Sequence, residues 1–223
     1  MRTGQTIDAI AEAIASAMPE LDATDRRIAL AIHRLMSSGE PVEPAEVALA
    51  SGTPMAQVNE RLDSWPGVYR NNQGRVVGFW GHAVSKLNPE YRFLIDGKTT
   101  YAWCALDTLF IPALLGKTAR VQAADPVTGD PVSLLVDKEG VRDVRPAETV
   151  VSMVVPDGPF GYDVIESFCH RVLFFASRAS GAEWSAQHNE TTLLSIEEAF
   201  ELGRTITRRI APDVAGATGG DSE

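Results

Sequence analysis

One apolar segment, residues 101–116, constrains this chain most, because it carries a cysteine and a carboxylate within a run that a fold must bury. Cys104 is followed three residues later by Asp107. If the segment is helical, residues three apart share a face, so both side chains point the same way. Burying a carboxylate among apolar neighbours is unfavourable unless it has a partner or a chemical role. A structural reading stays open, in which Asp107 caps a helix or forms a salt bridge and Cys104 is a small buried hydrophobe.

The second of the two cysteines, Cys169, lies in a comparable apolar segment, residues 167–177. In a reducing cytosol, two such cysteines are expected to be free thiols, metal ligands or catalytic groups rather than a disulfide. Two thiols beside a carboxylate suit an ion that accepts few ligands, such as mercury(II) or copper(I), since soft thiolates select soft metals. A four-ligand zinc site is not expected, because the chain has no CxxC and its histidines are scattered.

A cysteine hydrolase would need a base, normally histidine, to deprotonate the thiol. His170 follows Cys169 directly, so on a strand it would point to the opposite face. Asp107 would then have to carry the proton.

The balance of charge excludes some classes of partner. Lys and Arg number 20 against 30 Asp and Glu, a net charge of −10, which argues against general binding to nucleic acid or to anionic membrane. No apolar run reaches the roughly 18 residues that a membrane span needs. Residues 6–18 fit an amphipathic helix better than a signal peptide, because Asp8 and Glu12 interrupt the apolar positions. We therefore expect a cytoplasmic protein.

The N-terminal third predicts a winged-helix-like module. Three short helices are expected within residues 24–64, the first capped by Thr24 or Asp25 and the third by Thr53. A hairpin is expected over residues 67–80. Such modules often bind DNA through the third helix, but residues 21–65 hold four arginines, no lysine and seven carboxylates. Phosphate contacts need basic residues, so a module that packs over the second domain is favoured.

The remainder of the chain predicts strands with a few helices. Strands are expected at 91–95, 99–103, 119–123, 132–136, 150–155 and 171–177, and helices at 163–168 and 195–210, with a further helix after Cys104 that Pro112 kinks or ends. The predicted fold class is α+β: a three-helix winged-helix-like domain over residues 1–82, then a mixed or antiparallel β-sheet domain with flanking helices over residues 83–212. Residues 213–223 are expected to be a disordered tail.

The amino-acid sequence around both cysteines resembles that of one family. Residues 101–109, 112–114 and 116–121 are similar to the signature of bacterial organomercurial lyases, also called alkylmercury lyases. Further matching stretches are 128–133, 167–169, 174–177 and 183–184, and the resemblance extends over about residues 24–208. It implies that Cys104 and Cys169 are the catalytic cysteines and Asp107 the catalytic aspartate. Some relatives carry another cysteine where this chain has His170.

The resemblance implies protonolysis of the carbon–mercury bond of alkyl- and arylmercury compounds, for mercury detoxification. One thiolate, expected to be Cys104, takes mercury from a thiol adduct, and Asp107 accepts the proton of the other thiol and returns it to carbon. The hydrocarbon leaves, and mercury(II) stays on Cys104 and Cys169 beside Asp107. No cofactor is implied; the mercury acceptor would be a mercuric reductase or small cellular thiols.

Two other functions stay open. A non-catalytic binder of mercury or copper would use the same thiols but need no proton carrier, and a winged-helix metal sensor would bind DNA. Trp103, Leu106 and Phe110 are candidates for an apolar substrate pocket, although each also suits an ordinary core.

Overall fold

A computed structural model describes residues 6–212 of the chain. It begins with helix α1 (Ile7–Ala17), whose N-cap Thr6 accepts a hydrogen bond from the Ala9 N–H. The predicted amphipathic pattern is confirmed, since Ile10 and Ile14 are buried. The tail predicted to be disordered, residues 213–223, lies outside the described residues.

After α1, residues 23–79 hold three helices and a hairpin close to the predicted ranges. They are α2 (Ala23–Met36), α3 (Pro44–Ser51), α4 (Met55–Ser64), β1 (Val68–Arg70) and β2 (Val76–Phe79). The predicted N-caps are wrong by one to three residues. Asp22 caps α2 in a reciprocal capping box with Asp25, and Pro54 rather than Thr53 is the N-cap of α4. Asp22 is favoured as the cap of α2 because the two aspartate carboxylates accept hydrogen bonds from each other's backbone N–H groups, which have no partner within the helix.

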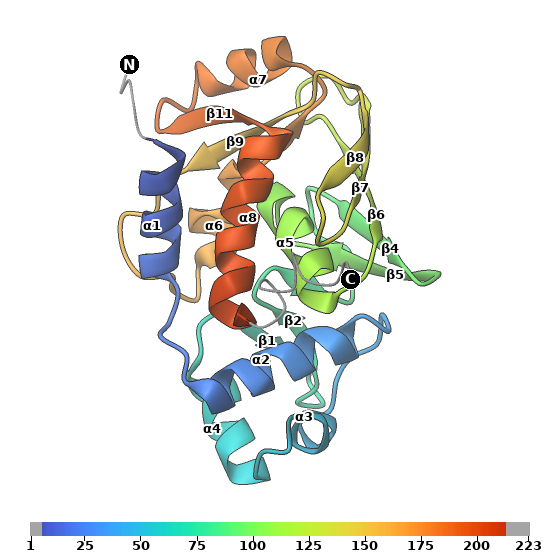
Figure 1. Cartoon of the computed structure of the whole chain (residues 1–223), viewed down its shortest axis with the longest axis vertical. Coiled ribbons are helices and arrows are strands. Elements are labelled where there is room, and N and C mark those ends of the chain that lie inside the picture. The colour runs from blue at the N-terminus through green and yellow to red at the C-terminus, as the bar shows by residue number, and fades with distance from the viewer. Residues whose placement is uncertain (1–5, 213–223) are drawn as a thin grey trace, which may run out of the picture.

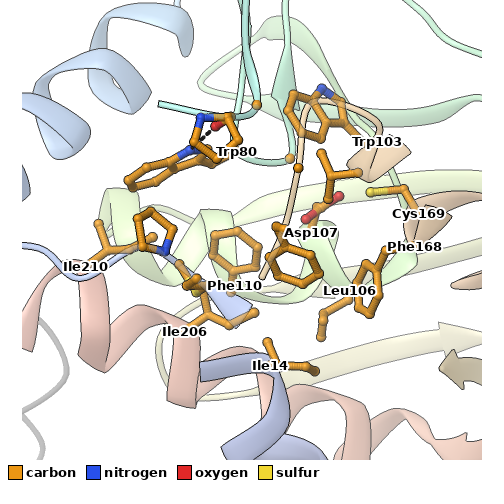
Figure 2. A pocket seen from close by; sticks show the side chains of 18 residues that line it. Ile14, Trp80, Trp103, Leu106, Asp107, Phe110, Phe168, Cys169, Ile206 and Ile210 are labelled. Atoms are coloured by element: carbon orange, nitrogen blue, oxygen red, sulfur yellow. Dashed lines mark hydrogen bonds between the residues drawn. The ribbon is translucent and has the colours of Figure 1, made fainter. Parts of the chain in front are cut away.

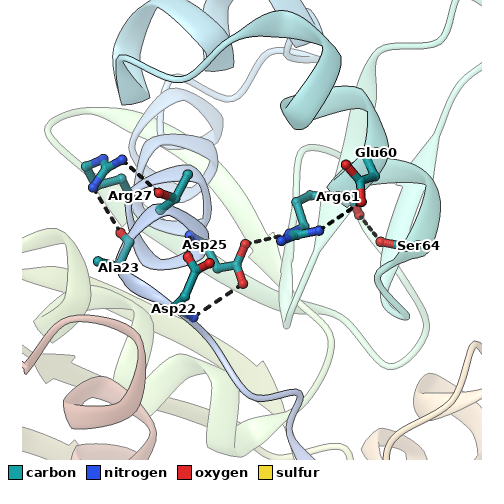
Figure 3. A network of polar contacts seen from close by, with 8 residues as sticks. Asp22, Ala23, Asp25, Arg27, Glu60, Arg61 and Ser64 are labelled. Atoms are coloured by element: carbon teal, nitrogen blue, oxygen red, sulfur yellow. Dashed lines mark hydrogen bonds and ion pairs between the residues drawn. The ribbon is translucent and has the colours of Figure 1, made fainter.

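An ion pair holds α2 against α4. The Arg61 guanidinium donates to Asp25 at 2.6 Å and also contacts Glu60, as Figure 3 shows. Since Asp25 also accepts from the Asp22 N–H, its carboxylate both caps the start of α2 and holds α4 against that helix.

Strands from both predicted domains form one antiparallel sheet. Its order is β1-β2-β3-β5-β4-β6-β7-β8, and the strands beyond the hairpin are β3 (His82–Ala83), β4 (Tyr91–Ile95), β5 (Lys98–Ala102), β6 (Ala119–Ala124), β7 (Pro131–Val136) and β8 (Val141–Arg145). A second sheet has the order β10-β9-β11, formed by Phe174–Phe175, Val150–Val154 and Thr191–Ser195. The expected α+β class with an antiparallel sheet is confirmed.

Helix α5 (Ala105–Leu115) lies at the centre of the molecule, and every one of its residues is buried. Figure 1 shows it beside α8 (Ile196–Ile210). The two helices approach closely at Gly203, where a Cβ would lie 3.3 Å from the Leu109 backbone. Of the two predicted effects of Pro112, the ending of the helix is wrong, since Pro112 lies inside α5, which continues to its C-cap Gly116. Packing on α8 and the sheet outweighs the loss of one hydrogen bond.

The segment predicted as a strand over residues 171–177 is the main error in the fold. Only Phe174 and Phe175 form β10, because residues Cys169–Arg171 coil into a short 3₁₀ helix after α6 (Val164–Ser167). The short strands β3, β8 and β11 and helix α7 (Arg178–Ser185) were not predicted. In the part of the chain that the structure describes, no helix is long and apolar enough to cross a membrane.

Candidate active site

Cys104 is placed by the junction between β5 and α5. It is the N-cap of α5, in extended conformation, and its side chain is fully buried. Its backbone N–H donates to Asp107 Oδ2 at 2.9 Å, so the carboxylate that shares its face also closes the first turn of the helix. Cys104 and Asp107, three residues apart, therefore lie on the same side of α5, as the sequence predicted.

Cys169 reaches the same place from a separate segment. The Ala105 N–H donates to the Val172 carbonyl at 3.0 Å and so ties the first turn of α5 to the chain just after Cys169. Ser152 of β9 binds the backbone of the same segment: its hydroxyl donates to the Arg171 carbonyl and accepts from the Leu173 N–H. These contacts hold the 3₁₀ turn in place of the predicted strand.

The three predicted site residues lie together. A ligand atom from each of Cys104, Asp107 and Cys169 lies within 4.8 Å of the others, and all three residues are buried. Both cysteines are free thiols. His170 is exposed and so points away from the cluster, as predicted, although the cause is the 3₁₀ turn and not strand alternation.

Burial controls the protonation of the cluster. It raises the pKa of Asp107 to about 7, against hydrogen bonds from Cys104 that lower it. Burial also raises the pKa of Cys104 well above its ordinary value, with further contributions from Cys169 and Asp107. The hydrogen bond with Cys104 lowers the pKa of Cys169, but burial and the Asp107 charge outweigh it, so that pKa is also raised. Near neutral pH the thiols are protonated, while Asp107 can gain or lose a proton.

Gly81 closes one side of the Asp107 carboxyl group. A Cβ on Gly81 would lie 2.2 Å from Asp107 Oδ1, and its φ is +90°. The Gly81 carbonyl also accepts from the Trp103 N–H at 2.9 Å. Only glycine combines this backbone conformation with so close an approach. The sequence reasoning missed Gly81, and the one available signal was a glycine directly after the predicted hairpin.

An apolar pocket of about 70 Å³ opens onto Asp107 and Cys169 (Figure 2). Trp103, Leu106 and Phe110, the predicted pocket candidates, all line it. They are joined by apolar side chains that the sequence reasoning did not assign, among them Ile14, Trp80, Phe160, Phe168, Ile206 and Ile210. Cys104 is not among the residues that line the pocket, so Cys169 is the thiol that faces it.

Two thiols and a carboxyl group with a pKa near neutrality, at the end of an apolar pocket, fit a protein that handles a soft metal ion carrying an apolar organic group. Comparisons with known proteins make the family specific. Residues 84–208 match the family model described as alkylmercury lyase, and residues 9–80 match the helix-turn-helix domain of alkylmercury lyase.

Individual relatives agree with the family models. Alkylmercury lyase of Staphylococcus epidermidis is 38% identical over 84% of this chain and 83% of its own length. The Pseudomonas putida enzyme is 37% identical over 92% and 93%, respectively. A solved structure, the mercury-bound form of MerB2, shares the fold with a TM-score of 0.71 at 18% identity, covering 92% of this chain and 98% of that one. The chain belongs to the alkylmercury lyase family, whose enzymes cleave carbon–mercury bonds.

Proposed function

We propose that Cys104, Asp107 and Cys169 perform the protonolysis of a carbon–mercury bond, giving a hydrocarbon and mercury(II) held by the two cysteines. The observation that carries this assignment is the meeting of two thiols and one carboxyl group within 4.8 Å at the end of an apolar pocket. The thiols supply soft ligands for mercury, and the carboxyl group supplies a proton carrier.

Cys169, rather than Cys104 as the sequence suggested, is proposed to take the mercury first. Cys169 lines the pocket, whereas Cys104 lies behind it. The Cys169 sulfur replaces the thiol that delivered R–Hg⁺, and the proton of Cys169 leaves with that thiol. The Cys104 thiol then gives its proton to the Asp107 carboxylate, which accepts a hydrogen bond from it, and the freed sulfur binds mercury.

Asp107 completes the reaction by returning this proton to carbon. Two thiolates donate electron density to mercury, so the electron pair of the carbon–mercury bond moves to carbon and takes the proton. The hydrocarbon leaves, and mercury(II) remains on Cys104 and Cys169. Because the pKa of Asp107 is about 7, the group can accept and release a proton near neutral pH, which efficient acid–base catalysis requires.

The proposal also covers the substrate, the cofactor requirement, the removal of the product and the cellular location. The substrate is an organomercurial delivered as a thiol adduct, no cofactor takes part, and small thiols or a mercuric reductase remove the product. Two free thiols require a reducing compartment, which supports a cytoplasmic location. We also retain the division at residue 82, which the separate family-model matches over residues 9–80 and 84–208 support although one sheet spans it. The three helices and the following hairpin support the winged-helix description of the N-terminal module.

The test measures mercury(II) stoichiometry and hydrocarbon release on one folded sample of each variant, with a phenyl- or methylmercury–thiol adduct. Asp107→Asn keeps the shape of the side chain but removes its titrating proton. It should still capture mercury(II), while release of benzene or methane falls roughly 10²–10⁴-fold. Asp125→Asn is the matched control: Asp125 is also buried but bonds to Ser180 and Ala176 outside the pocket.

The alternative, a non-catalytic binder of mercury or copper, gives a different result. Such a protein would capture mercury(II) without releasing hydrocarbon in its wild-type form. Full release by Asp107→Asn would instead show that the proton reaches carbon from another group, and the role of Asp107 would be wrong.

A further inference from the structure

We propose that helix α1 and the last turns of α8 form a specificity wall, defined by Ile14, Met18, Ile206 and Ile210, that selects for the size of the organic group on mercury. All four residues line the pocket. The inference rests on the proposed function, because it concerns the organic group that leaves during protonolysis. It gives the N-terminal helix a direct part in substrate choice.

The wall lies away from the reacting atoms. In Figure 2, Asp107 and Cys169 lie toward one side of the pocket, Ile206 and Ile210 lie toward the other with Phe110 between them, and Ile14 lies at the lower edge. A methyl group bound to mercury at Cys169 is too small to extend past the neighbours of Asp107. A phenyl or larger group extends along Leu106 and Phe110 toward the wall. Contacts with the wall are therefore available to large organic groups and not to methyl.

The position of α1 is fixed by contacts with two distant segments. The Phe160 N–H donates to the Ala17 carbonyl at 2.8 Å. From α8, the Arg209 guanidinium donates to the carbonyls of Met18 and Pro19 at 3.4 and 3.5 Å. Phe160 also lines the pocket, so these bonds join three parts of the lining at the end of α1. A wall held in this way can discriminate by shape.

The chemistry of the wall defines the group that it favours. Its four side chains, three isoleucines and a methionine, are apolar, and burying apolar carbon against them is favourable in proportion to the area removed from water. A missing methylene in an apolar pocket changes kcat/KM by roughly 10–200-fold. The wall should therefore favour aryl and larger alkyl groups over methyl.

The experiment compares two isoleucines one helical turn apart on α1. Ile14 lines the pocket, whereas Ile10 is equally buried but does not. Wild type, Ile14→Ala and Ile10→Ala receive phenylmercury and methylmercury adducts of the same thiol, and kcat/KM is measured from benzene and methane release. Ile14→Ala should lower the phenyl-to-methyl ratio about tenfold, and Ile10→Ala should leave it unchanged.

The outcomes distinguish a failure of the proposed function from a failure of the specificity wall. If wild type releases neither hydrocarbon, the proposed function is wrong. If wild type cleaves both compounds but the ratio is the same in Ile14→Ala, or falls equally in Ile10→Ala, the specificity wall is wrong. Should Ile14→Ala not fold, Ile14→Val and Ile206→Val must each lower the ratio in the same direction by a smaller factor, and an unchanged ratio in both overturns the proposal.

Discussion

Gly81→Ala tests whether close packing against Asp107 sets the position of its carboxyl group. The added Cβ would lie 2.2 Å from Oδ1 and 2.4 Å from Cγ of Asp107, far inside an ordinary contact of about 3.5 Å. The backbone at Gly81, with φ of +90°, is also unfavourable for alanine. Either the backbone or the carboxyl group must move.

The two effects have separable magnitudes. An alanine held at positive φ costs roughly 1–3 kcal/mol, and overpacking in a core costs a further 1–3 kcal/mol. Displacing a catalytic group by about 1 Å can lower the rate about 10²-fold. We therefore expect Gly81→Ala to lose both stability and hydrocarbon release, measured by urea unfolding and by benzene formation from a phenylmercury adduct.

Gly74→Ala is the matched control for backbone strain. Gly74 has φ of +79°, but no atom lies within 4 Å of the Cβ that alanine would add. It should lose stability from strain alone and keep full activity. If Gly81→Ala is as stable and as active as Gly74→Ala, the packing of Gly81 on Asp107 has no role in the reaction, and the reasoning is refuted.

Three further predictions concern the cysteines, a buried histidine and the N-terminal module. Cys104→Ser and Cys169→Ser should each abolish turnover in a folded protein, and wild-type-like hydrocarbon release by either would contradict the assignment. Burial lowers the pKa of His82 to about 3, so the unfolded chain binds a proton at this residue first as pH falls below about 6.5; the His82 contribution alone should then lower the free energy of unfolding by about 1.4 kcal/mol per pH unit. Urea unfolding should show a shallower acid loss in His82→Phe, and an unchanged slope would count against this cause. A gel-shift assay at low salt with micromolar protein should show no complex with DNA, since Arg61, Arg70 and Arg75 are engaged in ion pairs; a salt-sensitive complex would revive the sensor hypothesis.

Local patterns predicted most of the fold. The hairpin between β1 and β2, the turn joining β4 to β5 and the capping box of α8 depend on residues close in sequence, and each forms as expected. Long-range contacts decided the rest. Pro112 stays inside α5 because α8 and the sheet bury the whole helix, and the chain after Cys169 coils because Ser152 and Ala105 bind its backbone.

The site divides in the same way. The spacing of Cys104 and Asp107 predicted their shared face, the apolar setting of Cys169 indicated the second thiol, and the family resemblance implied the catalytic roles of all three. Nothing in the sequence pattern placed Ile14 of α1 and Ile206 of α8 in one pocket, since their arrangement depends on the tertiary packing of segments far apart in the chain. Pocket walls built from distant helices are therefore the part that local reasoning misses.

The stability of Asp107→Asn separates a catalytic carboxylate from a structural one. Burial raises the pKa of Asp107 from 3.8 to about 7, so the folded state binds the proton more tightly than the unfolded state. The associated stability is fully present below pH 3.8 and is lost as pH rises to about 7. Above that pH the charged group costs on the order of 4 kcal/mol, at 1.36 kcal/mol for each unit of pKa.

Asparagine is neutral at every pH and can still accept from the Cys104 N–H that now bonds to Asp107. Asp107→Asn should therefore match wild type in urea unfolding at pH 4 and exceed it at pH 8, while losing hydrocarbon release. A gain in stability together with a loss of activity means that the charge is retained for chemistry at the expense of the fold. If the variant is less stable than wild type at pH 8, the carboxylate stabilises the start of α5. Asp107 would then be a structural helix cap, the alternative that the sequence analysis kept.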